Sequence, residues 1–206
     1  MLLSDRLRIP FVVLSLIGIA FGTLAIFVPL LIKEAGVNLN PGLFYTAAAI
    51  ASFSVRIGAG RASDRIGRGR FITFSLILYA LSLLLLCFAR NAQTFLLAGF
   101  LEGGGIGTLM PMMIALTADR SLPQERGQVF SLTLSGFDLG TAIAGPILGF
   151  FAAQFGYRGL FGIASILALI ACMIFVTLSS KNVRYSLRFS LGRGHDVYAL
   201  PPSAQG

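Results

Sequence analysis

The sequence predicts an all-α membrane protein with six membrane-spanning helices, on three observations. The chain of 206 residues is 56% hydrophobic and only 12% charged, whereas a soluble domain averages about 25% charged residues. Its apolar residues gather into runs of about 20 residues, the length that a bilayer requires. The runs are apolar on every helical face and lack the period-two alternation of barrel strands. Because backbone groups in lipid need internal partners, spanning helices are expected.

Hydropathy divides the chain into six such runs. The expected helices cover residues 10–32, 41–60, 71–89, 95–116, 129–152 and 159–178. The first run is too long for a signal peptide and has no small-residue cleavage site after a short core, so we expect it to be a retained helix. Residues 1–180 therefore form one expected transmembrane domain. Residues 181–206 are polar and basic and end in Pro, Ser, Ala and Gly, so a disordered tail is expected there.

The basic residues predict the orientation in the membrane. Three of them, Lys33, Arg90 and Arg158, fall on one side of the expected spans. The twelve on the other side are Arg6, Arg8, Arg61, Arg65, Arg68, Arg70, Arg120, Arg126, Lys181, Arg184, Arg188 and Arg193. Arg56, expected about one turn inside the second helix, can snorkel to the richer side. The positive-inside rule then places both termini in the cytoplasm, and we expect a multi-pass protein of the plasma (inner) membrane.

The net charge of +8 does not indicate a nucleic-acid partner. Nucleic-acid binding needs basic residues on a folded polar surface, and here the arginines lie between apolar runs. The lipid bilayer is the partner that explains them.

The densest charge lies in the short stretch Ala59–Arg70, AGRASDRIGRGR. Gly60 is expected at a helix end, where the missing side chain lets another helix approach. Asp64 is expected near the start of the turn, where it can cap backbone N–H groups or face a helix N-terminus. Gly67 permits a tight return.

This pattern resembles the loop signature of the major facilitator superfamily, Gly-x-x-x-Asp-Arg-x-Gly-Arg-basic, which lies between the second and third helices of each six-helix half. The matching residues are Gly60, Asp64, Arg65, Gly67 and Arg68. Gly69 replaces the usual second basic residue, although Arg70 follows at once. The resemblance implies a charge network that holds the loop against the opposite half and breaks and reforms during alternating access. The five matching residues are thus candidate gating residues.

The resemblance extends over nearly the whole chain. TADRSLPQERGQVFS resembles the family's second cytoplasmic loop, and SGFDLGTAIAGPILGFFAAQFGYRGLF resembles the fifth helix and the turn into the sixth. Small residues four apart let helices pack closely in lipid, and a proline can kink a helix. The candidate packing residues are Gly136, Gly140, Gly145, Pro146 and Gly149. Part of this run is similar to the antiporter signature Gly-Pro-x-x-Gly-Gly, but Phe150 replaces its last glycine, so exchange is not inferred.

The family has about twelve helices and this chain has six, with most likeness to the C-terminal half. The resemblance implies 3+3 inverted repeats within the half and a substrate site between two halves. Three explanations are open, in order of preference: a truncated or split gene product, a half that pairs with a separate polypeptide, and a homodimer. The expected function is that of a secondary transporter moving a small solute by alternating access, with proton-coupled efflux as one option. Sugars, drugs and organic acids all fit this architecture.

Two acids fall inside the expected spans, where charges are costly and usually functional or paired. The family's first and fourth helices line the cavity, so Glu102 is a candidate for proton coupling or for binding a cationic substrate. A packing acid hydrogen-bonded to a neighbouring helix is the equal alternative. For Asp138, on the fifth helix, a structural or gating role is favoured over substrate contact. Phe21 and Phe27 are candidate cavity residues, although packing is the commoner role of such aromatics.

Other classes of protein fit less well. An intramembrane serine protease needs a base near its nucleophile, and the only histidine, His195, lies outside the spans. A six-helix channel usually carries re-entrant Asn-Pro-Ala-like turns, which are lacking. We therefore expect no enzyme. Cys87 and Cys172 lie in apolar runs, and nothing indicates a disulfide framework, a metal site or a cofactor. A non-transporting fragment or scaffold that pairs with another membrane protein stays open, because fold alone does not prove activity.

Overall fold

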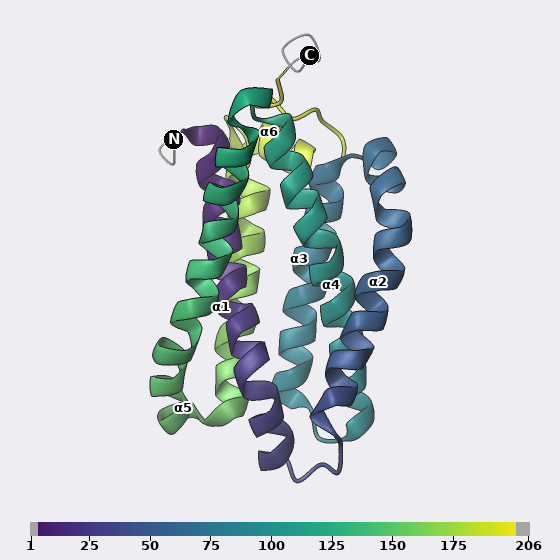
Figure 1. The fold of residues 1–206 in the computed structure, drawn as a ribbon, viewed down its shortest axis with the longest axis vertical. Coiled ribbons are helices and arrows are strands. Elements are labelled where there is room, and N and C mark those ends of the chain that lie inside the picture. The colour runs from purple at the N-terminus through teal and green to yellow at the C-terminus, as the bar shows by residue number, and fades with distance from the viewer. Residues whose placement is uncertain (1–3, 201–206) are drawn as a thin grey trace.

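The computed structural model describes residues 4–200, without the side chains of Asp5 and of residues 59–62 and 64–66, and shows one bundle of long helices (Figure 1). Its elements are α1 (Asp5–Glu34), α2 (Pro41–Ile66), α3 (Arg68–Phe88), α4 (Ala92–Asp119), the 3-10 turn η1 (Pro123–Glu125), α5 (Arg126–Leu178) and α6 (Val183–Ser190). The all-helical fold class predicted from the sequence is confirmed. The long helices extend a few residues beyond most of the expected apolar runs.

α5 consists of two legs that reverse at Gly156. This residue has φ of 65° and ψ of 173°, a conformation that glycine adopts without the steric cost of a side chain. The reversal falls between the fifth and sixth expected spans. Figure 1 shows the first leg (residues 126–155, green) and the second (residues 157–178, yellow-green) running in opposite directions. With α1 to α4, the bundle has six long helical legs.

Within the described residues, four helical segments are long and apolar enough to cross a membrane by length and composition. They are Arg6–Glu34, Arg68–Phe88, Ala92–Asp119 and Pro123–Leu178, the last of which contains both legs of α5. α2 is 26 residues long but is not among them. Its sequence, rich in Ala, Ser and Gly, carries several charges towards its end.

Asparagine side chains fix where two of the helices begin. Asn40 accepts a hydrogen bond from the Gly42 amide (2.9 Å) and is followed by Pro41 in the first turn of α2. Asn91 accepts hydrogen bonds from the amide (2.9 Å) and the hydroxyl (2.8 Å) of Thr94 at the start of α4. Such caps satisfy amides that have no partner inside the helix.

Two seams of glycine hold the bundle together. In the first, α1 packs on the first leg of α5, where a methyl group added at Gly18 would overlap the backbone of Phe137, and one at Gly140 that of Ser15. In the second, α2 packs on α4, where a methyl group at Gly103 would overlap the backbone of Ala48. Helices that approach this closely pack through backbone contacts, as small residues allow in membrane proteins.

Serine hydroxyls join α3 to α4 and to the second leg of α5. Ser82 donates to the carbonyl of Ala98 on α4 (2.8 Å). Ser165, on the second leg of α5, donates to the carbonyl of Ala80 on α3 (3.1 Å). Buried apolar residues of α1 to α5 form one continuous core.

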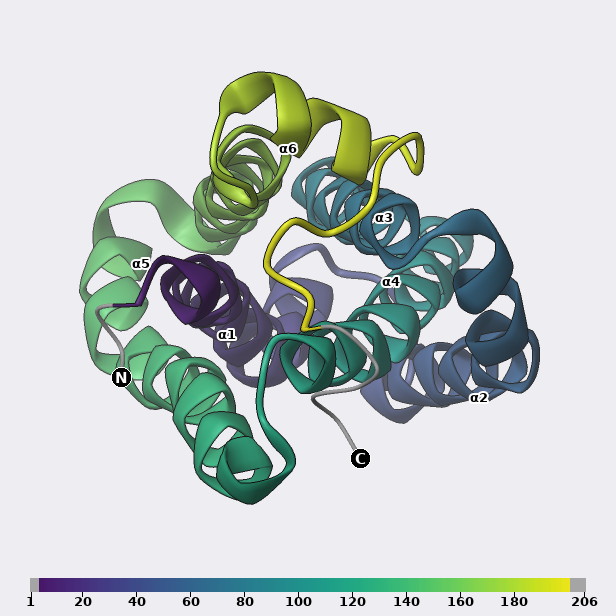
Figure 2. The same ribbon diagram turned by 90° about the horizontal axis from the view of Figure 1, so that it is seen from above.

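The segment expected to be a disordered tail is folded where the structure describes it. Val183–Ser190 form α6, and residues 191–200 cross over the end of the bundle towards α4 (Figure 2). Phe189 packs on the ring of Phe175, with centroids 6.1 Å apart, and the Leu200 amide donates to the carbonyl of Asp119 (2.8 Å). The expectation of disorder rested on composition alone, whereas these contacts join residues far apart in the chain.

Candidate functional site

One end of the bundle, here called the basic end, gathers most of the charged residues. It holds the start of α1, the turn between α2 and α3, the connection from α4 to α5, and residues 181–200 (Figure 1). Lys33, Arg90 and Arg158 lie at the opposite end, where Arg158 donates to the carbonyl of Cys87 (3.2 Å). The arrangement in space thus follows the division of basic residues read from the sequence.

Gly67 alone joins α2 to α3 at the basic end. It has φ of 99° and its amide donates to the carbonyl of Ser63 (2.9 Å). α2 runs on to Ile66, so the helix end expected at Gly60 is wrong by six residues. Residue 64 therefore lies in the last turn of α2, before the turn itself. The side chains of Asp64 and Arg65 lie outside the described part of the structure, and so does the packing around residue 60. The gating roles of these three residues stay predictions.

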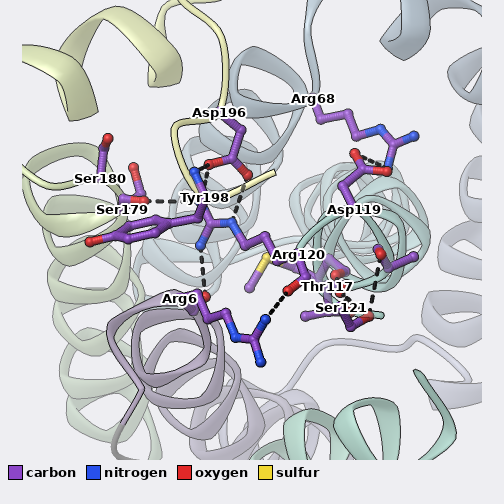
Figure 3. A network of polar contacts seen from close by, with 12 residues as sticks. Arg6, Arg68, Thr117, Asp119, Arg120, Ser121, Ser179, Ser180, Asp196 and Tyr198 are labelled. Carbon is purple, nitrogen blue, oxygen red and sulfur yellow. Dashed lines mark hydrogen bonds and ion pairs between the residues drawn. The ribbon is translucent and has the colours of Figure 1, made fainter. Parts of the chain in front are cut away.

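Arg68, the first residue of α3, pairs with an acid on another helix. Its guanidinium lies 2.6 Å from the Asp119 carboxylate (Figure 3). Asp119 is the last residue of α4. The ion pair thus connects the start of α3 to the end of α4, a contact that the sequence analysis did not anticipate.

Arg120 is the hub of the basic end and is fully buried. Its guanidinium donates to both carboxylate oxygens of Asp196, at 2.6 and 3.0 Å. It also donates to the carbonyls of Arg6 (2.9 Å) and Ser179 (2.9 Å). The ring of Tyr198 lies 5.3 Å from its central carbon (Figure 3). One side chain at the end of α4 therefore contacts α1, the end of α5 and the tail.

A second, more exposed ion pair lies beside this hub. Arg6 contacts the Glu125 carboxylate at 3.0 Å and donates to the carbonyl of Arg120 at 3.1 Å. The Glu125 carboxylate also accepts the Leu122 amide (3.0 Å), which closes the η1 turn. Since both partners are partly solvated, we assign this pair a smaller share of stability than the buried one.

Glu102 is a buried carboxylate in the middle of α4, 4% exposed. It has no hydrogen bond to any residue that the structure describes. Its charge lies close enough to Tyr45 on α2 and Tyr79 on α3 for electrostatic interaction. The hydroxyl of Tyr79 is itself buried without a hydrogen bond within the described residues. Between α2, α3 and α4 there is thus an acid and a phenol whose polar atoms are not used by the fold.

Asp138 and Arg56 are charges on outward-facing helix surfaces. Asp138 is exposed on the first leg of α5, about 18 Å along the helix from Arg126. Arg56 is exposed on α2 and donates to the carbonyl of Gly107 (3.2 Å). Because α2 ends at Ile66, Arg56 lies almost three turns inside the helix, and the expectation of one turn is wrong.

The aromatic candidates on α1 pack against α5. Phe27 is buried against Tyr157, with ring centroids 5.9 Å apart. Phe21 is half-buried against Phe137, with centroids 5.3 Å apart. These ring contacts suit packing residues, and a cavity role for Phe21 and Phe27 stays a prediction.

The small residues of the first leg of α5 differ in how tightly they pack. Gly136 and Gly140 lie against the α1 backbone and leave no space for a methyl group. Gly145 and Gly149 have only side-chain neighbours, at 3.3 and 4.0 Å from an added methyl group. Pro146 lies inside the helix, and the non-helical residue of α5 is Gly156.

The partner roles of Asp119, Arg120 and Asp196 were not predicted from the sequence. Two features of the sequence could have indicated this contact. Asp119 and Arg120 follow an apolar run directly, and Asp196 is the single acid of a basic tail. No group of three potential metal ligands occurs within residues 4–200 as described.

An apolar bundle of antiparallel helices with one charged end defines an integral membrane protein. Residues 10–195 match the model of the Major Facilitator Superfamily, and the chain belongs to this family.

Relatives and solved structures agree with this assignment. The chain is 28% identical over 193 residues to Multidrug resistance protein 2 of Bacillus subtilis (strain 168), covering 92% of this chain and 48% of that protein. It is 29% identical over 133 residues to the 3-(3-hydroxy-phenyl)propionate transporter of Escherichia coli (strain K12), covering 65% and 33%. The crystal structure of the peptide transporter POT in complex with sulfate superposes with a TM-score of 0.73 at 18% identity, over 97% of this chain and 41% of that one. The chain thus spans less than half the length of these relatives.

Proposed function

We propose that this chain forms one six-helix half of a major facilitator transporter, which moves a small solute by alternating access between two halves. The proposal rests on the surface of α5 around Asp138, which no other described part of the chain covers. An ionised carboxylate is not stable against lipid at this depth without a polar partner or water. A second half, or the aqueous cavity between two halves, supplies that environment.

The pattern of helix contacts supports a 3+3 inverted repeat. Such a repeat relates α1 to α4, and α2 to the first leg of α5. The seam between α1 and α5 is then the counterpart of the seam between α4 and α2. Both seams are built from glycine backbone contacts, as two copies of one ancestral contact would be. On this basis we assign six membrane crossings, α2 included.

We assign the exposed faces of α2 and of the first leg of α5 to the second half. These faces carry large apolar side chains together with Arg56 and Asp138. The exposed apolar residues are Leu43, Tyr45, Ile50, Phe53, Ile57, Leu139, Ile143, Ile147 and Phe150. The excess of arginine at the basic end favours placing that end, with both chain termini, in the cytoplasm of a bacterial inner membrane. Likeness in the fifth and sixth spans leads us to assign the chain to the C-terminal half.

Glu102 is our candidate for the coupling residue. A buried carboxylate without a hydrogen bond can take up and release a proton at little structural cost. The unbonded Tyr79 hydroxyl beside it offers a donor to the charged form. From the sequence, a packing role for Glu102 was as well supported as a role in proton coupling. Because Glu102 forms no hydrogen bond to a described residue, we favour the role in proton coupling.

Replacing Glu102 by Gln is expected to lower proton-driven transport about a hundredfold or more, the usual scale for loss of a proton-transfer group. The amide keeps the size of the side chain but cannot carry a proton. Transport would be measured in vesicles with an imposed pH gradient, with the second half present. The names of the relatives suggest two probes, ethidium for multidrug export and 3-(3-hydroxyphenyl)propionate for aromatic acid uptake.

Glu34→Gln is the matched control, because Glu34 is an exposed acid at the end of α1. It should transport at the parent rate. An unchanged rate and pH dependence in Glu102→Gln would exclude Glu102 as the coupling residue. Absence of transport for both probes in the parent, with the second half present, would instead favour the scaffold alternative.

A further inference from the structure

The outer face of α6 is both basic and apolar. The side chains of Arg184 and Arg188 are exposed and form no hydrogen bond or ion pair with the residues that the structure describes. Val183, Leu187 and Leu191 are 53%, 41% and 55% exposed. An apolar stripe of this kind on a short helix is unusual if water is its only neighbour.

The apolar and the basic side chains occupy two adjacent stripes along the helix. At 100° per residue, Val183, Leu187 and Leu191 form one stripe, and the two arginines form a second stripe displaced by about 100°. The opposite side faces the bundle and carries the buried residues of α6, which are Ser186, Phe189 and Ser190. The apolar stripe is therefore not the side of the helix that packs on the bundle. A groove of about 570 Å³ is lined by Val183, Arg184, Leu187, Arg188, Leu191 and Arg193.

α6 is held at the level where a membrane-spanning helix ends. Only four residues separate it from Leu178, the last residue of α5. Phe189 and Gly69 fix it to the bundle, because Phe189 packs on Phe175 and its carbonyl group lies directly against Gly69. Figure 2 shows α6 at the rim of the bundle, beside the ends of α3 and α5. Its free surface thus meets the boundary between lipid and water.

We propose that this surface of α6 binds the headgroups of anionic phospholipids. An interfacial helix inserts its apolar stripe at the boundary of the acyl chains and its basic stripe among the headgroups. Arginine matches the phosphate oxygens with paired N–H donors. Asp196, the single acid of the tail, is bound to the buried Arg120, so it does not neutralise the arginines of α6. Each arginine near an anionic surface strengthens binding about fivefold.

The chain contains no tryptophan, so Leu187→Trp places a single fluorophore on the proposed surface. The protein is reconstituted in phosphatidylcholine vesicles that contain a small fraction of brominated phosphatidylglycerol or brominated phosphatidylcholine. Bromine quenches tryptophan only on contact, so the two quenching curves give the relative affinity of α6 for the two lipids. We expect a preference of about 25-fold for the anionic lipid, because each of the two arginines contributes about fivefold.

The preference should fall close to one in the double variant Arg184→Gln/Arg188→Gln. The control is the double variant Lys33→Gln/Arg90→Gln, which removes two exposed charges at the opposite end of the bundle and should leave the preference unchanged. Tyr185→Trp gives a second reporter on α6 if Leu187→Trp perturbs the helix. Equal quenching by both lipids would overturn the proposal. So would a preference that survives the arginine substitutions, or a tryptophan that neither lipid quenches, as expected if protein covers this face.

Discussion

Gly140→Leu is expected to destabilise the bundle by about 3 kcal/mol, at the upper end of the usual cost of overpacking. A side chain at this position would overlap the backbone of Ser15, and the neighbouring atoms belong to Gly18 and Ile19 of the same helix. Backbone cannot rotate aside as a long side chain can. The whole of α1 would have to move away from the first leg of α5, with loss of packing along the seam.

The measurement is the free energy of unfolding in mixed micelles, followed by circular dichroism during titration with a denaturing detergent. Gly127→Leu is the control, because it makes the same substitution in the same helix where no atom lies within 4 Å of an added methyl group. It should be neutral or slightly stabilising, since leucine favours helix over glycine. Equal stability of the Gly140 and Gly127 variants would show that the glycine seam does not hold α1 against α5.

Arg120→Met is expected to cost about 3 kcal/mol or more, because it leaves the Asp196 carboxylate without its partner. The Arg120 side chain is 0% exposed and that of Asp196 is 8% exposed, so water cannot replace the lost contacts. The carbonyls of Arg6 and Ser179 would also lose a donor. The tail and the ends of α1 and α5 should loosen together, and amide hydrogen exchange there should rise.

A double-mutant cycle separates this pair from general damage. Arg120→Met combined with Asp196→Leu should be less destabilised than the sum of the two single variants, because no buried charge is left unpaired. Arg6→Gln is the comparison on the surface pair, whose side chains are 30% and 18% exposed, and it should cost at most about 1 kcal/mol. Strict additivity in the cycle would contradict a direct role of the Arg120–Asp196 pair in stability.

The helices could be predicted from the sequence because each follows from local composition. Runs of apolar residues gave the long helical segments, and the break near Gly156 was bracketed by the polar stretch between two runs. The helix end at Gly60 was wrong because a glycine inside α2 was taken as its end. The reversal between α2 and α3 requires only Gly67, whose φ of 99° is positive.

The charged end of the bundle could be predicted only in part, for a physical reason. The loop signature singled out Arg68, but its partner Asp119 lies at the end of another helix. Arg120 and Asp196 are 76 residues apart, and no local pattern joins them. The tail folds because Arg120 binds its one acid and Phe189 finds a site on α5, whereas its polar composition alone suggests disorder.

The central claim is that this six-helix chain works with a second half. Its most direct test is the mass of the particle that contains the chain in its own membranes. The particle would be excised in polymer nanodiscs, so that subunits stay together, and captured with an antibody to the C-terminal residues. The account predicts a protein mass of about twice the 21.9 kDa of this chain or more, whether from a longer product, a separate half or a second copy. A particle that contains a single 21.9 kDa chain and no other protein would contradict it.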